Sequence, residues 1–126
     1  MRYRTGAFAR AAGVTVRTVR YYDQIGLLRP AEVDPASGYR AYTPAQLHDL
    51  RRILDLKALD FTLEEIGAVL AGALTPHDMR GLLEAKRDEA RRPAREAAER
   101  LERLDRWLAG LGEGGATAGS DAARPG

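Results

Sequence analysis

Two arginines and two tyrosines lie close together in the segment TVRTVRYYDQIGLL, residues 15–28. Arg17 and Arg20 lie near the start of this segment, and Tyr21 and Tyr22 follow directly, with a single acid after them. A guanidinium group can bind phosphate or the edge of a guanine, and a tyrosine offers a phosphate one O–H donor on a rigid apolar body. Such residues on one short helix favour a nucleic-acid contact. For Tyr22 we favour the alternative that it packs into a core.

The charge of the chain is uneven, although its 126 residues carry a net charge of only +2. Residues 1–57 hold ten Lys/Arg against five Asp/Glu, a balance of +5, whereas residues 58–126 hold ten against thirteen, a balance of −3. A basic first half fits a polyanionic partner. A solvated surface with uneven charge is the competing interpretation.

The composition argues against several other classes of protein. The chain has no cysteine and two lone histidines, so we expect no disulfide, no metal site and no cofactor. The sequence shows no nucleophile–base pair, phosphate-binding Gly-rich loop or carboxylate cluster, so we do not expect the protein to be an enzyme. No apolar run approaches the roughly 20 residues that a membrane span needs, and the N-terminus lacks a signal-like apolar segment. We therefore expect a cytoplasmic protein that does not bind membranes.

The elements that must position the opening residues begin with two short helices. Thr5 is the expected cap of the first helix, which Gly13 ends, and Thr15 is the expected cap of the second, which stops before Gly26. Apolar residues at helical spacing are expected to face inward: Phe8, Ala9 and Ala12 in the first helix, and Val16, Val19 and Ile25 in the second. Two short helices joined by a tight turn with glycine form a helix-turn-helix.

The next segment, LLRPAEVDPASGYRAYT at residues 27–43, predicts a small hairpin. Pro30 and Pro35 exclude a helix, and the run of Asp, Pro, Ser and Gly is typical of a turn. We expect Leu27–Leu28 and Tyr39–Tyr42 to pair as two short strands. This hairpin would be a wing that follows the helix-turn-helix.

Three threonines are expected to cap the remaining helices, in TPAQ, TLEE and TPHD, each with an amide or acid three residues later. The predicted helices run over residues 44–59, 63–71 and 76–111. Their expected core residues are Leu47, Leu50, Ile53, Leu54, Leu59, Phe61, Leu63, Ile66 and Leu70.

The last predicted helix carries a heptad repeat. Its apolar residues form two series with a period of seven: Leu83, Ala90, Ala97, Leu104 and Leu111, and Ala94, Leu101 and Leu108. A lone helix would expose this seam, so a second copy of the chain is the expected partner, with a helix folded back on its own domain as the alternative. The residues expected at the dimer contact are Ala97, Leu101, Leu104, Trp107, Leu108 and Leu111. For Trp107, stacking on a ligand is the alternative.

Two further features qualify the last helix. Pro93 lies inside it, where a proline costs about 3 kcal/mol, so we expect a bend or two helices that meet near residue 92. Residues 112–126 are rich in Gly and Ala and are expected to be disordered. The predicted domains are therefore residues 1–72, residues 76–111 and a tail.

Three segments, GVTVRTVRYYDQIGLLRP, GYRAYT and LRRILDLKALDFTLEEIGAVL, resemble the DNA-binding domain of the MerR family of bacterial transcription regulators, over residues 3–72. The resemblance implies a mainly α fold, namely a winged helix-turn-helix with a small β-hairpin wing, followed by a long helix that forms an antiparallel coiled coil in a homodimer. It also implies binding to an inverted repeat in double-stranded promoter DNA with an overlong spacer. The activated dimer would bend and untwist that spacer so that RNA polymerase can engage both promoter elements.

The residues expected to contact DNA are Thr5, Thr15, Arg17, Thr18, Arg20, Tyr21, Tyr39, Arg40 and Lys57. Arg17 is the best candidate for a guanine or phosphate, and the resemblance gives Tyr21 a backbone phosphate. Arg40 would contact a phosphate or the minor groove from the wing, where Tyr42 is expected only to cover the hairpin. A plain surface lysine is an equally good interpretation of Lys57.

What the chain lacks narrows the signals to which such a regulator could respond, and one alternative to a DNA-binding role also remains. Metal- and redox-sensing members of the family use cysteines, which are absent here, and drug-sensing members carry an effector domain where this chain has a short Gly/Ala-rich segment. A small-molecule inducer at the junction of head and coil and a constitutively active dimer both fit the sequence. A MerR-like head can also act as an adaptor for another protein, but Arg17, Arg20 and Arg40 favour DNA.

Overall fold

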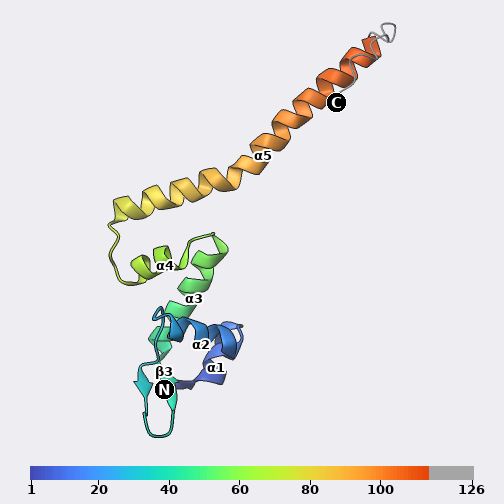
Figure 1. Ribbon diagram of the computed structural model, residues 1–126. Helices are drawn as coiled ribbons and strands as arrows, with labels where there is room; N and C mark the ends of the chain where they lie inside the picture. Colours follow the sequence, from blue (N-terminus) through green and yellow to red (C-terminus); the bar gives the residue numbers. More distant parts are fainter. Residues whose placement is uncertain (114–126) are drawn as a thin grey trace. The chain divides into compact units, whose positions relative to one another are not determined.

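The computed structural model describes residues 1–113 of the chain (Figure 1). These residues fall into two compact units. We call Met1–Leu82 the head and residues 83–113 the distal helix. The tail predicted for residues 112–126 lies outside the described residues from residue 114 onward, and its first two residues belong to the last helix.

The helix-turn-helix consists of α1, Thr5–Ala12, and α2, Val16–Gln24. Gly13 ends α1 in the left-handed conformation, with φ of 74°, and its N–H bonds to the carbonyls of the last turn. The side chain of Thr15 caps α2 by accepting a hydrogen bond from the N–H of Thr18 at 3.1 Å. The predicted end of the first helix and the predicted cap of the second are therefore confirmed.

The prediction that Thr5 caps α1 is wrong. Thr5 is already the first helical residue, and Arg4 holds the N-cap position without a side-chain hydrogen bond. The reason is strand β1, Tyr3–Arg4, which was not among the elements expected from the sequence. Because this strand supplies an extended backbone at Arg4, the helix begins one residue earlier than the polar side chain of Thr5 suggests.

The sheet has three antiparallel strands in the order β1-β3-β2, where β2 is Glu32–Val33 and β3 is Arg40–Tyr42. Its register places Tyr3 opposite Tyr42 and Val33 opposite Arg40. The hairpin formed by β2 and β3 is the predicted wing, and the N-terminal strand adds to its other side. The wing is therefore tied to the start of the chain as well as to the helices.

The prediction that Leu27–Leu28 form the first strand of the hairpin is wrong. The N–H groups of both leucines bond to the carbonyl of Tyr22, at 2.9 and 3.1 Å, and so close the end of α2. The side chain of Leu28 is buried in the core. These backbone groups are not available to a strand ladder, and the chain first becomes extended at Glu32.

The remaining helices are α3, Pro44–Ala58, α4, Leu63–Leu70, and α5, Pro76–Glu113. All three begin directly after a threonine, as predicted. Thr43 and Thr62 form full capping boxes. Thr75 exchanges two hydrogen bonds with Asp78, at 3.0 and 3.1 Å, in the same manner. These reciprocal bonds satisfy backbone N–H groups that have no partner within the helix, which fixes where each helix starts.

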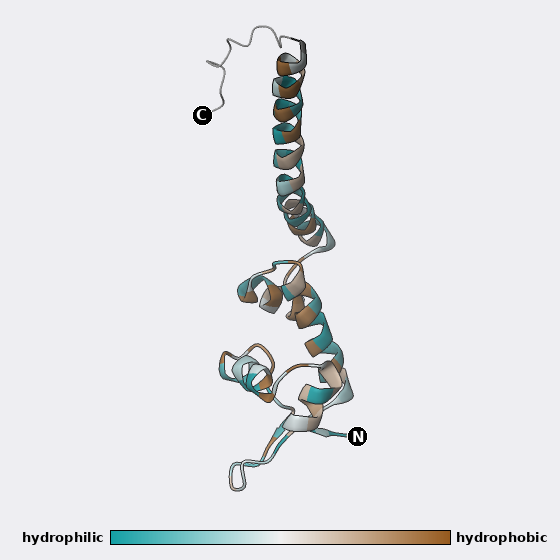
Figure 2. Cartoon of the chain, turned by 90° about the vertical axis from the view of Figure 1, so that its right-hand side faces the viewer, coloured by the Kyte–Doolittle hydropathy of each residue, from teal (hydrophilic) through white to brown (hydrophobic). Residues whose placement is uncertain are grey.

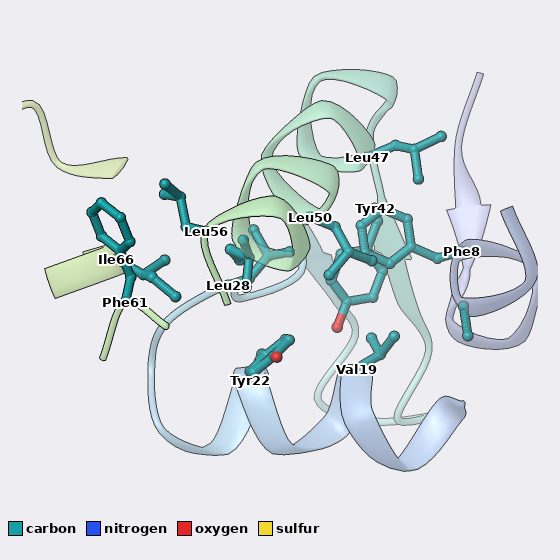
Figure 3. Packing of buried hydrophobic residues seen from close by; sticks show 12 residues of the cluster. Phe8, Val19, Tyr22, Leu28, Tyr42, Leu47, Leu50, Leu56, Phe61 and Ile66 are labelled. Carbon is teal, nitrogen blue, oxygen red and sulfur yellow. The ribbon is translucent and has the colours of Figure 1, made fainter. Parts of the chain in front are cut away.

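One hydrophobic cluster holds the head together (Figure 3). Its buried members come from α1 to α4 and from the wing: Phe8, Ala9, Val19, Tyr22, Leu28, Tyr42, Leu47, Leu50, Ile53, Leu56, Phe61 and Ile66. The rings of Phe8 and Tyr42 stack with their centroids 4.1 Å apart. This stack joins α1 to the wing strand, so the position of the wing is set partly by core packing.

Two residues predicted in this core are instead exposed. Ile25 and Leu59 expose 45% and 53% of their surface, and both occupy C-cap positions, where the helical spacing that placed them inside no longer applies. After Leu59 the chain reverses through Asp60, with φ of 65°, so that Phe61 enters the core. Leu56 is buried as well, although it was not in the predicted set.

The helix α5 continues as one helix through Pro93. Figure 1 shows that it changes direction in its middle part, which is the bend expected where a proline removes a backbone hydrogen bond. Apolar residues recur along the distal helix (Figure 2). Within residues 1–113, no helix is both long and apolar enough to cross a membrane.

Candidate nucleic-acid interface

Helix α2 divides its residues between the core and the surface. Val19 and Tyr22, three residues apart, are buried, whereas Arg17, Arg20 and Tyr21 lie on the exposed side. This division follows from the helical period, since residues at i, i+3 and i+4 share one face. The core holds the helix by its apolar face and presents both arginines and one tyrosine to solvent.

An open depression of about 710 Å³ lies between the start of α1, the second half of α2 and the wing. It brings together four of the predicted contact residues: Thr5, Arg20, Tyr39 and Arg40. The other residues that line it are Arg4, Gly6, Asp23, Gln24, Ser37 and Gly38. The lining therefore includes three arginines and one acid, a balance that attracts an anion.

A smaller depression of about 300 Å³ brings together four more of the predicted residues: Arg17, Thr18, Tyr21 and Lys57. Lys57 comes from the last turn of α3, and Leu63 from the start of α4 completes the lining with Tyr22. The sequence left Lys57 open between a phosphate contact and a plain surface lysine. Its place beside Arg17 adds a second positive charge to this depression.

Thr15 has a local role in this arrangement. Its Oγ1 lies 3.0 Å from the Oγ1 of Thr18 and accepts the N–H of that residue, so it starts α2 and orients the Thr18 hydroxyl. The predicted residues Thr15 and Thr18 are thereby joined to each other.

Arg4 lines the larger depression, although it was not among the residues predicted to contact DNA. Its guanidinium lies over the ring of Tyr39, 4.7 Å from the centroid, in a cation–π contact. Two residues earlier in the chain, Arg2 pairs with Glu32 of β2 at 3.2 Å. No local signal identifies Arg4, because β1 has only two residues and therefore almost no periodic pattern.

Arg40 and Asp23 form an ion pair and a hydrogen bond that join β3 of the wing to α2. The Asp23 side chain keeps 16% of its surface exposed and that of Arg40 keeps 42%. Arg40, the wing arginine predicted to contact DNA, is therefore held by Asp23 of α2, the helix predicted to enter the major groove.

Burial raises the pKa of the Tyr22 phenol, and the neighbouring Tyr21 raises it further. Burial also raises the pKa of Tyr42, as does the charge of Asp23, while Arg40 acts in the opposite direction. Both phenols are therefore neutral near pH 7. Tyr22 packs in the core, as favoured from the sequence. Tyr42, which was expected only to cover the hairpin, is buried in the same core, and Tyr21 and Tyr39 lie at the surface.

The dimer-contact residues predicted on the distal helix are all exposed: Ala97, Leu101, Leu104, Trp107, Leu108 and Leu111. The exposed fraction reaches 65% at Leu108 and falls no lower than 40%, at Trp107, among the five large ones. Monomeric surfaces rarely carry a contiguous apolar stripe of this kind. In residues 1–113, no group of three or more His, Asp or Glu could hold a metal ion.

Comparisons with known proteins agree on one family. The model of the MerR HTH family regulatory protein matches residues 3–73. The transcriptional regulator BrlR of Pseudomonas aeruginosa is 39% identical over 108 residues, which cover 84% of this chain and 40% of BrlR. This chain spans less than half the length of this and other curated relatives that it matches.

Two solved structures share the fold over most of both chains. A MerR-family transcriptional regulator from Bacillus cereus superposes with a TM-score of 0.69 at 28% identity, covering 88% of this chain and 83% of its own. HiNmlR, described as a MerR-family regulator lacking the sensor domain and bound to promoter DNA, superposes with a TM-score of 0.57 at 26% identity, covering 92% and 94%.

Proposed function

This chain belongs to the MerR family of regulatory proteins, and from this premise we propose that it regulates transcription by binding inverted-repeat promoter DNA as a homodimer. The observation that carries the proposal is the arrangement around the exposed face of α2, where Arg17 and Lys57 line one depression and Arg4, Arg20 and Arg40 line the other. Five basic side chains gathered there, beside one acid, suit the phosphates on both sides of a DNA groove.

Within this proposal α2 is the recognition helix. Its N-terminal half carries Arg17 and Thr18, and this half of a recognition helix meets base edges in the major groove. Arg17 reads a guanine or holds a phosphate beside it, and Tyr21 and Lys57 hold the backbone next to it.

The second set of contacts surrounds the larger depression. Arg20, Tyr39 and Arg40 contact phosphates or the minor groove at the flank of the half-site. Because no side chain caps α1, the N–H groups near Thr5 can bind a phosphate at the positive end of that helix. Phosphates on the two sides of α2 would then fix the register in which its side chains reach the bases.

Dimerisation through the distal helix gives the second head that an inverted repeat requires. Between Ala90 and Leu111, the seam has alanines in its first part and leucines in its last part. If Leu101 lies opposite the partner subunit's Leu104 in an antiparallel pair, Ala97 lies opposite the partner subunit's Leu108. Each outer layer then joins a small side chain to a large one, which keeps the layers evenly filled.

Charges beside the seam favour the same register. In it Trp107 lies near the partner subunit's Arg100, where a cation–π contact is available. A shift of one heptad in one direction brings Arg100 beside the partner subunit's Arg100, and a shift in the other direction brings Asp105 beside the partner subunit's Asp105. Both shifts place like charges together, and the second gains no opposite charges in return, which disfavours it. The first also brings Arg91 beside the partner subunit's Asp105, so this shift is the one that needs a control.

Cysteine cross-linking tests this register on a chain that has no cysteine of its own. A variant with Ala97→Cys and Leu108→Cys is expected to form a covalent dimer under mild oxidation. A disulfide within one chain is excluded, because eleven residues of helix span roughly 16 Å. A variant with Ala94→Cys and Leu104→Cys, which would pair after a one-heptad shift, serves as the control. Preferential cross-linking of the control would contradict the register.

The regulatory step proposed for this dimer is a change in DNA shape. It bends and untwists an overlong promoter spacer, and RNA polymerase then engages both promoter elements. This places the protein in the cytoplasm with its promoter. We propose no catalytic role for it, and its relatives carry the names of transcription regulators.

Footprinting on the DNA upstream of the protein's own coding sequence tests the proposed function. We expect two protected half-sites related by an inverted repeat, with enhanced cleavage at the distorted centre between them. A duplex in which one half-site is scrambled is the matched control, and it should lose protection on both sides at limiting protein. Protection of a single site, or none at concentrations that saturate other regulators of this kind, would contradict dimeric operator binding. A search for protein partners would then follow.

A further inference from the structure

We propose that Asp23 is a specificity-determining residue that competes with DNA phosphate for Arg40. The wing arginine would add to binding only where the DNA brings a phosphate close enough to displace the carboxylate. This role rests on the DNA binding proposed above, and it assigns to Asp23 an effect that opposes the binding of Arg40 to DNA. Asp23 was the single acid in the opening segment of the sequence, and no contact with DNA was expected of it.

The geometry places the carboxylate between the two DNA-contacting elements. Asp23 lies near the end of α2 and Arg40 begins β3, and a hydrogen-bonded ion pair joins them. Asp23 is also close enough to the Tyr42 phenol to raise the pKa of that group. The carboxylate therefore faces the wing and the core at once, and does not swing freely in solvent.

Charge in the surrounding depression supports a competing role. Among the ten residues that line it, Asp23 is the one acid, against Arg4, Arg20 and Arg40. Arg4 is engaged on the ring of Tyr39. A phosphate that enters this depression thus meets positive side chains, and the one carboxylate there already holds the arginine that the phosphate would bind.

The ion pair is suited to being exchanged. Arg40 keeps 42% of its side chain exposed while paired, and ion pairs that remain in contact with water contribute little to folding stability. A DNA phosphate can therefore reach Arg40 from solvent. It displaces the carboxylate only where its attraction for Arg40 outweighs the cost of leaving Asp23, whose side chain keeps 16% of its surface exposed, without its partner. On DNA of the wrong shape the phosphate stays out of reach, and Arg40 stays with Asp23.

The competing interpretation is an ordinary surface ion pair that merely braces the wing. The salt dependence of binding separates the two, because each phosphate neutralised by the protein adds about 0.9 to the slope of log affinity against log salt. A brace changes how well the wing is held. A competitor changes how many phosphates are neutralised on DNA that lacks the right shape.

The test compares Asp23→Asn with the wild-type chain by fluorescence anisotropy, on the footprinted operator and on a scrambled duplex, over a salt series. We expect the slope on the scrambled duplex to steepen by about 0.9 per head that engages it, since Arg40 is released. The slope on the operator should stay the same, and the ratio of operator to scrambled affinity should fall several-fold.

Two controls isolate the arginine from the loss of one negative charge. Asp49→Asn makes the same change on α3, where Asp49 pairs with Arg52 at 3.8 Å and lines neither depression. In an Arg40→Ala background, Asp23→Asn should change binding only as much as Asp49→Asn does. Asp23→Glu, which keeps a carboxylate, is expected to retain the wild-type slopes, and thermal melts confirm that each variant is folded.

Equal slope changes on both duplexes, or a change no larger than that of Asp49→Asn, would overturn the competing role and leave a brace. Failure of the proposed function looks different, because the wild-type chain would then show no preference for the operator at all. The scrambled-duplex slopes still report on Arg40 in that case, so the two failures are distinguishable.

Discussion

In the head, the side chains of Phe8, Leu50 and Ile53 have no exposed surface, whereas Leu101, Leu104 and Leu108 of the distal helix each expose more than half of theirs. The head buries its apolar residues within one chain, because α1, α2, β3, α3 and α4 cover one another. The distal helix carries a comparable set of leucines on one stripe, and within residues 83–113 no second layer covers it. The head thus folds around its own core, and the exposed stripe supports the proposal that a partner completes the distal helix.

Leu104→Asp should break this comparison most severely. It places a carboxylate in the proposed seam of each chain, and an unpaired charge buried there costs several kcal/mol per chain. We expect sedimentation analysis to show monomers at concentrations where the wild-type chain is dimeric. Ala109→Asp adds the same charge off the seam and should leave the dimer intact. A dimeric Leu104→Asp variant would mean that the seam is wrongly assigned.

Phe8→Ala should show the same contrast inside the head. Phe8 is fully buried and stacks on Tyr42, so its truncation is expected to lower the free energy of unfolding of the head by about 3–5 kcal/mol. Leu59→Ala, at an exposed C-cap position, is the control and should change it by less than about 1 kcal/mol. Chemical denaturation measures both. Similar losses for the two variants would contradict the burial that separates them.

Arg17→Ala separates the head from the distal helix in DNA binding. We expect it to weaken operator binding by about 1–3 kcal/mol and to relax the preference at one base position in each half-site. Arg91→Ala, on the distal helix, should leave operator affinity within about 0.5 kcal/mol of wild type. Anisotropy on operators mutated base by base measures the effect. Unchanged discrimination in Arg17→Ala would remove Arg17 from base reading.

The smallest effect concerns alkaline pH. Tyr22 and Tyr42 have pKa values raised above 10.0 in the folded head, so folding favours their protonated forms. This contribution to stability is fully present below about pH 10 and is lost as the pH rises through the folded-state pKa values. Tyr42→Phe should flatten the fall of the melting temperature above pH 10, and the exposed Tyr39→Phe should not. Parallel profiles for all three proteins would contradict this assignment.

Local signals in the sequence were enough to place most helices. The threonine caps, the glycine after α1 and the helical spacing of apolar residues act within a few positions, so α2 to α5 begin where predicted. Strand β1 and the true first strand of the wing could not be found in this way. Two-residue strands carry almost no periodic signal. Their positions depend on backbone bonds to distant residues: the Tyr22 carbonyl accepts the N–H groups of Leu27 and Leu28, which keeps both leucines out of the wing, and Tyr42 pairs with Tyr3.

The candidate site also combines residues that local sequence signals identify with contacts that they do not. Arg17, Arg20 and Tyr21 could be selected from their types and spacing on one helix. The link between Asp23 and Arg40, and the approach of Lys57 to Arg17, join residues far apart in the sequence and depend on the packing of the head. Arg4 was missed for the same reason, because its partner Tyr39 is distant in the sequence and directly precedes β3, the strand that pairs with β1.

The most direct test of the central claim is the affinity of the purified full chain for the duplex upstream of its own coding sequence, against a scrambled duplex of the same length and composition. Fluorescence anisotropy at several salt concentrations gives both affinities and their salt slopes. We predict a clear preference for the native duplex, with a steep slope that reflects phosphates held by two heads. Equal and weak binding to both duplexes would contradict a sequence-specific DNA-binding function for the basic face of α2.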